Sequence, residues 1–374
     1  MTNEEYWFWL GNINDLWQND IKKLLDGLGT PENIYDAGKV DLIGLGKMNT
    51  QQAERIAASR GSAGIWNRFE RVKKDGILFI HPGHDQYPER FSVLKDMPYT
   101  IYVKGAFPDT CVPSVGVVGA RACTGYGREM ASKISTAVSL SGGQVISGMA
   151  VGIDSLAARA AITAGGKTFA VLGSGVDVIY PRESIDLYYS IIMNGGGIIS
   201  EYPLGTRPWP WQFPHRNRLI SALSDKLVII EAARHSGTLS TAGHALDQGV
   251  DIYALPGRLG DKLSEGCNSL ISDGAGILLS PEEFVDTVWA DFKAPFPAAV
   301  ENRAMSAEGT NEPLDNEKDP KVRVLKAVGY TPVSFKSIRE MACLETGALS
   351  ELISLLELEG LIRQISADYY VRSQ

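Results

Sequence analysis

The sequence predicts an α/β protein whose largest domain is built on a doubly wound, mostly parallel sheet. From Ser114 to Ala290, apolar runs of strand length alternate with segments of helical character. Each run is nearly continuous in apolar residues, which is typical of strands covered on both faces. Glycine-rich turns follow several runs, at the end of the sheet where ligands bind. These observations indicate a doubly wound core with strands at Val115–Val118, Gln144–Ser147, Thr168–Leu172, Gly197–Ser200, Leu227–Ile230, Asp251–Ala254 and Gly276–Leu278.

The segments before this core predict a helical domain and a lead-in to the sheet. Residues 1–70 have helical character, and Leu42–Lys47 followed by Asn49–Ala58 resembles one helix-hairpin-helix unit. We expect a small accessory domain that is SAM-like or helix-hairpin-helix-like, with DNA contact by the hairpin as the alternative. The core domain, 71–290, would then include two lead-in strands at Ile77–Ile80 and Tyr99–Val103.

The segments after the core predict a linker and a winged-helix-like domain. Residues 291–320 mix Pro, Ala, Asn and acids without periodicity, which is typical of a flexible linker. In 321–374, three helical segments precede a β-hairpin. The third helix would read a DNA groove in such a domain, but here it contains or adjoins four glutamates and has no Lys or Arg. Such a surface repels phosphates, so we interpret this domain as a protein-contact or structural module.

Composition restricts the class of protein. The chain has 374 residues, of which 44% are hydrophobic and 21% charged, enough for two or three globular domains. It shows no basic-plus-apolar leader and no apolar run of about 18 residues, so we expect a cytoplasmic protein with no membrane partner. Its four cysteines are scattered, which argues against a zinc site and against a disulfide framework.

Charge is distributed unevenly along the chain. The net charge of −8 argues against a protein that coats nucleic acid over its whole surface. Residues 113–220, however, hold nine Lys/Arg and six Asp/Glu, a balance of +3. Residues 301–320 hold six acids and two bases, a balance of −4. The overall charge therefore does not exclude a local basic groove.

The turn Gly119–Thr124 predicts an anion site. It lies between an apolar strand and a helical segment, which is how an α/β protein points backbone N–H groups at an anion. Arg121 adds a permanent cation whose planar fork can hold a phosphate with two hydrogen bonds. Phe213–Arg218 brings two more guanidiniums to the start of another helix. A phosphate-lined groove is the leading hypothesis.

Three further turns are expected at the same edge of the sheet. They are Ser147–Asp154, with Asp154 as a helix N-cap, then Gly173–Asp177, and Ser236–Thr238 before a helix. The alternative for each is that a short turn uses glycine for steric reasons alone.

The segment Arg207–Arg218 interleaves aromatic residues with cations in a proline-rich loop. Single-stranded nucleic acid requires both chemistries, because bases stack on aromatic faces and the backbone attracts cations. The alternative is that Trp209, Trp211 and Phe213 fill a hydrophobic gap, with the two tryptophans as the first candidates for packing.

Catalytic patterns are poor. None of the five histidines forms a metal-ligand spacing, and the sequence has neither a G-x-S-x-G elbow nor a Walker loop. We therefore expect a protein that is not an enzyme and has no catalytic residue, metal or cofactor.

The glycine-rich turns and the aromatic loop described above resemble those of the DNA-processing protein A (DprA/Smf) family. The matching segments follow one another over roughly 115–285, and their joint order is specific. They are Gly119–Arg121, Ser147–Asp154, Val171–Pro181, Phe213–Arg218, Glu231 with Ser236–Ala242, Ala254–Gly257 and Gly266–Ile271.

The resemblance implies an extended Rossmann-like core that binds single-stranded DNA and forms a homodimer. Similar proteins protect incoming single strands during natural transformation and load a RecA-type recombinase onto them. By motif position, the DNA groove would be lined by Arg121, the Ser147–Gly148 turn, Phe213, Arg216, Asn217 and Arg218, with Arg182 as a further phosphate contact. His215 occupies a variable position of the motif and is assigned no role. The expected DNA-binding residues are Gly119, Arg121, Ser147, Gly148, Gly173, Arg182, Phe213, Arg216, Asn217, Arg218, Ser236, Gly237 and Thr238.

Two other functions stay open at this point. One is a nucleotide-binding Rossmann-like enzyme of the phosphoribohydrolase type. Against it, His235–Thr241 lacks the double glycine and the glutamate that such hydrolysis would use. The other is a scaffold protein that senses a free nucleotide and acts through its end domains.

Overall fold

The computed structural model describes residues 1–290, 292, 320–328, 333–366 and 368–372. Within them, a nine-stranded sheet has the order β1-β2-β6-β5-β4-β3-β7-β8-β9. All neighbours from β6 to β9 are parallel, which confirms the predicted fold class. The seven predicted core strands are confirmed to within one residue at each end: β3 (Ser114–Val118), β4 (Gln144–Ser147), β5 (Thr168–Val171), β6 (Gly197–Ser200), β7 (Lys226–Ile229), β8 (Asp251–Ala254) and β9 (Gly276–Ile277).

The two lead-in strands extend the sheet at one edge. β1 (Leu78–Ile80) pairs antiparallel with β2 (Ile101–Gly105), and β2 pairs antiparallel with β6. Between them the chain makes only the short helix η1 (Glu89–Phe91).

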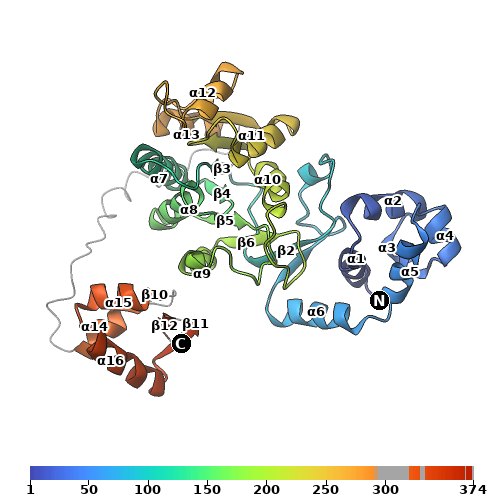
Figure 1. Ribbon diagram of the computed structural model, residues 1–374, viewed down its shortest axis with the longest axis horizontal. Coiled ribbons are helices and arrows are strands. Elements are labelled where there is room, and N and C mark those ends of the chain that lie inside the picture. The colour runs from blue at the N-terminus through green and yellow to red at the C-terminus, as the bar shows by residue number, and fades with distance from the viewer. Residues whose placement is uncertain (291, 293–319, 329–332, 367, 373–374) are drawn as a thin grey trace.

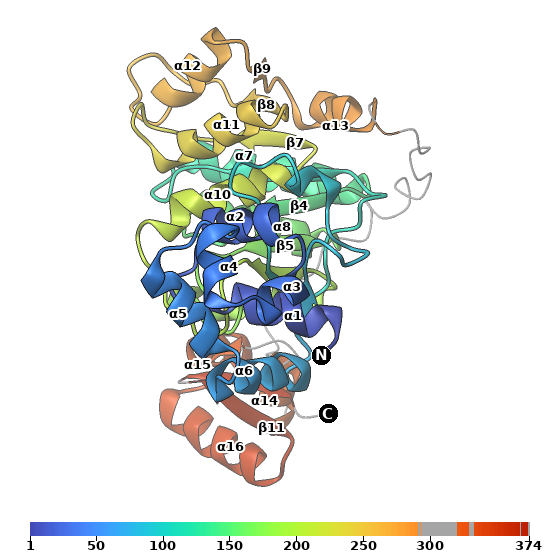
Figure 2. The same ribbon diagram turned by 90° about the vertical axis from the view of Figure 1, so that its right-hand side faces the viewer.

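Helices cover both faces of the sheet, as the apolar strands require. Alternate strand residues pack to opposite sides, so that Val117 faces one helical layer and Val118 the other. One face is covered by α7 (Gly125–Leu140), α8 (Ile153–Thr163), α9 (Ile185–Met193) and α13 (Pro281–Ala290). The other is covered by α10 (Gln212–Ala222), α11 (Gly237–Asp247) and α12 (Glu265–Ser272), the last of which lies near β8 and β9 (Figure 2).

The N-terminal helices lie beside the β2–β6 end of the sheet (Figure 1). Their apolar core is continuous with that of the sheet, because Phe8 packs on Phe79 and Tyr102 and belongs to the same buried cluster as Ile198. The helices are α1 (Asn3–Gly11), α2 (Gln18–Leu28), α3 (Pro31–Asp36), α4 (Lys39–Gly44), α5 (Thr50–Ser59) and α6 (Ala63–Lys74).

The described residues from 320 onward form three helices and a small antiparallel sheet. The three helices and the hairpin follow the predicted order, and β10 (Val333–Ser334) is an additional strand. The apolar core of this part includes Val324, Ile338, Leu349 and Tyr370. The elements are α14 (Pro320–Ala327), β10 (Val333–Ser334), α15 (Phe335–Ala342), α16 (Thr346–Leu358), β11 (Ile362–Ser366) and β12 (Tyr369–Arg372). The predicted linker, 291–320, lies outside the described residues except for Phe292 and Pro320.

Candidate functional site

A pocket of about 420 Å³ opens where the order of the strands reverses. From β3 the chain builds β4, β5 and β6 on one side, and then returns to build β7, β8 and β9 on the other. Such a reversal leaves a crevice beyond the carboxyl ends of the two central strands. The predicted residues that line this pocket are Gly119, Arg121, Phe213, Arg216, Asn217, Ser236, Gly237 and Thr238.

The turn after β3 presents Arg121 to the pocket. A Cβ on Gly119 would lie 2.7 Å from Cγ1 of Ile153, so only glycine lets α8 approach the strand this closely. Arg121 is exposed, and its Cζ lies 5.7 Å from the ring centroid of Phe213. The guanidinium therefore stands beside an aromatic face at the pocket wall.

The N-terminus of α7, which was expected to face an anion, instead faces a carboxylate of the protein itself. Thr124 caps the helix by accepting a hydrogen bond from Gly127 N at 3.1 Å. Its own backbone N and hydroxyl donate to the buried carboxylate of Glu231, at 2.9 and 2.5 Å. Glu231 thus occupies the anion position at this helix N-terminus, and Arg121 is the charged side chain that the turn presents to the pocket.

The turn after β4, which leads from Ser147 to Asp154, packs against the buried side of the pocket. Ser147 was predicted to contact DNA, but its buried hydroxyl donates to Val117 O at 2.7 Å, inside the sheet. Asp154 was predicted to be an N-cap, but Gly152 occupies that position with φ of 85°. The carboxylate of Asp154 instead accepts from the backbone N of Gly148 and Ala150, at 3.2 and 3.4 Å, and lines the pocket.

Arg216 forms the floor of the pocket. The residue is 4% exposed, and its Nη1 donates to the carbonyl oxygens of Gly148, at 3.0 Å, and Val171. Burial lowers the pKa of this guanidinium to about 10, with Asp154 acting in the opposite direction. Gly148 does not line the pocket; it is buried against Arg216, and a Cβ there would lie 2.6 Å from Nη2.

Asp154 gives this floor a group that titrates near neutral pH. Burial raises the pKa of its carboxyl to about 6, although Arg216, the two backbone donors and Arg121 favour the ionised form. A ligand phosphate would meet a cationic floor whose charge Asp154 partly offsets.

The remaining walls are one polar and one aromatic. Asn217 Nδ2 donates to Ser240 Oγ at 3.0 Å and to Gly237 O at 3.3 Å, and Ser236 caps α11 by accepting from Thr238 N. On the other side, the rings of Phe213 and Tyr180 lie 5.4 Å apart. Tyr180 was not predicted as a site residue, although it directly precedes Pro181 in one of the matching motifs.

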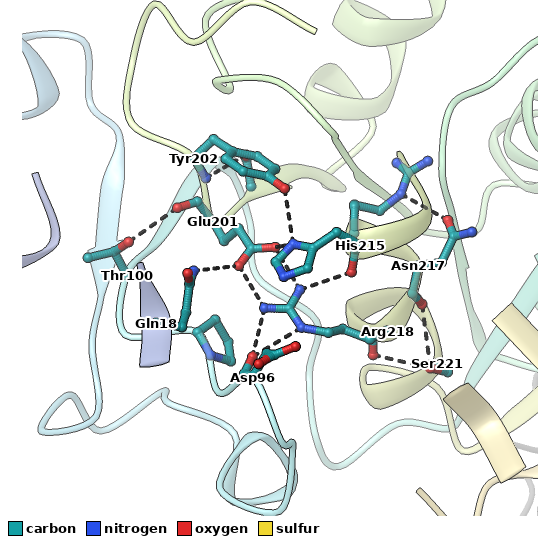
Figure 3. A network of polar contacts seen from close by, with 12 residues as sticks. Gln18, Asp96, Thr100, Glu201, Tyr202, His215, Asn217, Arg218 and Ser221 are labelled. Carbon is teal, nitrogen blue, oxygen red and sulfur yellow. Dashed lines mark hydrogen bonds and ion pairs between the residues drawn. The ribbon is translucent and has the colours of Figure 1, made fainter. Parts of the chain in front are cut away.

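Arg218 was predicted to bind DNA, and the structure contradicts this prediction. Arg218 does not line the pocket. Its side chain pairs with Glu201, with Nη1–Oε1 and Nη2–Oε2 distances of 2.6 and 2.7 Å (Figure 3). Its other N–H donors reach the carbonyl oxygens of Asp96 and His215. Burial alone raises the pKa of Glu201, but Arg218 and His215 outweigh it and hold that pKa at about 2. With 4% exposure and these partners, Arg218 is a structural residue.

Two other predicted residues also lie outside the lining of the pocket. Gly173 is buried behind Phe213, where an added Cβ would lie 3.1 Å from Cδ1 of that ring. Arg182 is exposed at the start of the short helix η2 (Arg182–Ser184), after Tyr180.

The aromatic loop does not fill a gap in the core. Trp209 is 59% exposed and Trp211 47%, so the packing interpretation of these two residues is wrong. Among the described residues, no cluster of His, Cys, Asp and Glu side chains could hold a metal ion. Nor does any helix in the described part of the chain combine the length and apolarity that crossing a bilayer requires.

Comparison with known proteins identifies the family. The sequence profile described as "DNA recombination-mediator protein A" matches residues 78–289. The chain belongs to the DprA/Smf family. The resemblance inferred from the motifs is thereby confirmed, and a "DprA winged helix domain" profile matches residues 308–367.

Individual DprA/Smf proteins resemble the chain over most of its length. Protein Smf of Escherichia coli K12 is 31% identical over 373 residues, covering 99% of this chain and 96% of the relative. The crystal structure of DprA from Streptococcus pneumoniae superposes with a TM-score of 0.66 and 31% identity, over 79% of this chain and 99% of that one. A DprA structure from Helicobacter pylori, reported for its single-stranded DNA binding mode, gives a TM-score of 0.50 and 29% identity over 57% and 96% of the two chains.

Proposed function

We propose that this chain binds single-stranded DNA in the pocket between the ends of β3 and β7. The observation that carries the proposal is the exposed guanidinium of Arg121 beside the ring of Phe213, at the mouth of a pocket with a cationic floor. Arg121 contacts a backbone phosphate, and Phe213 with Tyr180 provides an aromatic surface for a base. The Helicobacter pylori relative, a single-stranded DNA binder by its description, supports this assignment.

The chemistry of the walls fits a single strand better than a duplex. In a duplex the bases are stacked on each other, whereas a single strand can place a base on an aromatic ring while its phosphate meets a cation. The polar wall of Asn217, Ser236 and Thr238 has hydroxyl and amide groups that can bond to sugar or phosphate oxygens without selecting a sequence.

In the cell, this binding serves recombination. The chain protects incoming single strands during natural transformation and loads a RecA-type recombinase onto them, as a homodimer in the cytoplasm. Membership of a recombination-mediator family supports this role, and the resemblance supports the recombinase and the dimer.

Fluorescence anisotropy with a labelled oligo-dT and its duplex counterpart, at two salt concentrations, tests the binding proposal. Wild type should bind the single strand more tightly than the duplex, and more weakly as salt rises. Arg121→Ala should weaken single-strand binding about tenfold or more, because a charged hydrogen bond contributes about 1.5–3 kcal/mol. Its logarithmic salt dependence should become shallower by about 0.7 for each phosphate that the variant no longer neutralises.

Lys133→Ala is the matched control, because it also removes one positive charge from the segment that starts at β3. Lys133 pairs with Glu129 along α7, at 2.7 Å, and does not line the pocket. Its affinity should stay within about twofold of wild type, since an exposed pair contributes little. Equal losses in the two variants would show that binding follows net charge and not this pocket.

A further inference from the structure

A second hollow, of about 580 Å³, lies between the N-terminal helices and the loop that leads into α10. Three tryptophans line it: Trp17 at the start of α2, and Trp209 and Trp211 in the loop. We propose that these tryptophans form a second platform for nucleobases, which extends the single-stranded DNA path beyond the first pocket. This inference rests on the proposed function.

The three tryptophan residues are exposed to an unusual degree for such large apolar residues. Trp17 is 52% exposed, Trp211 47% and Trp209 59%. Indoles are normally buried to a large extent, and a group of exposed aromatic residues marks a binding surface. Trp17 and Trp211 meet edge to face, with centroids 5.4 Å apart and an interplanar angle of 70°, an arrangement that leaves ring face available for stacking.

The platform is held in place by contacts between the N-terminal helices and the sheet. Gln18, next to Trp17, donates to Glu201 at 3.0 Å, within the network that holds Arg218 (Figure 3). Asn12 Nδ2 donates to the hydroxyl of Tyr102 at 2.7 Å, in a buried environment. Trp17 is thus positioned relative to Trp211 before any ligand arrives, which lowers the ordering cost of binding.

One segment of chain separates the second hollow from the first pocket. Pro210, Phe213 and Pro214 line the first pocket, whereas Trp209 and Trp211 line the second hollow. A strand bound beside Phe213 therefore reaches the tryptophans by crossing this single loop. Because the two sites are continuous, the same ligand is expected at both. The ligand proposed for the tryptophan platform is therefore the bases of single-stranded DNA.

The charges of the second hollow indicate that stacking dominates there. Its lining cation Arg68 donates to the Oδ1 and backbone oxygen of Asn12, both at 3.2 Å. Its lining carboxylates are paired too, Asp15 with Arg55 and Glu201 with Arg218. The contribution of the tryptophans should therefore depend little on salt, in contrast to that of Arg121.

The test compares oligo-dT of two lengths, about 4 and about 16 nucleotides, which bracket the site sizes of single-strand binding folds. Trp17→Ala, Trp209→Ala and Trp211→Ala should each weaken binding of the longer oligonucleotide about tenfold and leave the shorter one within about twofold. The salt dependence should keep its wild-type slope. Trp17→Phe, which retains an aromatic face, should recover most of the affinity.

Val40→Ala is the matched control, because Val40 is an 83% exposed apolar residue of the same N-terminal helices that does not line the hollow. It should bind both lengths as wild type does. Unchanged affinity of the tryptophan variants for the longer oligonucleotide would overturn the inference, as would equal losses at both lengths. If Arg121→Ala still weakens binding in those cases, the proposed function stands and only the platform is disproved.

Discussion

Arg216 and Arg218 lie two positions apart on α10 and have opposite surroundings. Arg216 forms the floor of the pocket between β3 and β7, whereas Arg218 is enclosed by Glu201, Asp96 and His215 on the other side of the helix. Residues at i and i+2 do not share a helix face, so a single groove cannot use both side chains. Spacing along a helix is thus as informative about a guanidinium as its presence in a motif.

The two carboxylates beside these arginines show the same contrast. Glu201 accepts two short hydrogen bonds from Arg218, and its pKa is held at about 2. Asp154 accepts from backbone N–H groups near Arg216, and burial raises its pKa to about 6. The ion pair of Arg218 and Glu201 is therefore fully hydrogen-bonded and supports the fold. Asp154, in contrast, can still change its protonation state when a ligand binds.

The largest expected effect comes from breaking the ion pair of Arg218 and Glu201. Arg218→Ala should lower the free energy of unfolding by about 3–5 kcal/mol, because it leaves the Glu201 carboxylate buried without its partner. Urea denaturation followed by circular dichroism measures this loss. The double variant Arg218→Met, Glu201→Gln should regain part of the stability. A loss below about 1 kcal/mol would contradict the structural assignment of Arg218.

The next effect concerns the support of Arg216. Gly148→Ala adds a Cβ 2.6 Å from Nη2 of Arg216 and 2.7 Å from Oδ2 of Asp154, so the guanidinium must move. Single-strand affinity should fall severalfold, with a loss of stability of about 1–3 kcal/mol. Gly243→Ala is the control, since Gly243 lies in α11 with no neighbour within 4 Å of its added Cβ. That variant should be stabilised by up to about 1 kcal/mol, with normal DNA binding.

The smallest effect is a pH dependence of binding. As pH falls from about 7.5 to about 5.5 through the raised pKa of Asp154, its carboxyl is neutralised and the pocket becomes more positive. Affinity for oligo-dT should therefore rise severalfold. Asp154→Asn should bind more tightly at the higher pH and lose this part of the pH dependence, which separates it from the titration of histidines. An identical pH profile in wild type and variant would contradict the role of Asp154.

Features of the fold and the site that depend on local sequence patterns were predicted, whereas side-chain positions that depend on residues distant in the chain were missed. Strands, alternation and the exposed Arg121 followed from apolar runs and glycine turns, because both faces of a parallel sheet must be apolar. The burial of Arg218 depends on Glu201 and Asp96, which are 17 and 122 residues away. The orientation of the Ser147 hydroxyl depends on Val117 in a neighbouring strand. The group that faces the N-terminus of α7 is Glu231, which accepts a hydrogen bond from the capping residue Thr124. Such pairings are set by tertiary packing, which single-sequence patterns do not encode.

The N-terminal helices and the sheet share one apolar cluster and the hydrogen bond from Gln18 to Glu201. Excising residues before the first strand would therefore uncover an aromatic surface on the sheet domain, with aggregation as the expected outcome. The N-terminal helices cannot be exchanged independently of the sheet. A chimera with a relative should therefore transfer the helices together with the sheet edge on which they pack.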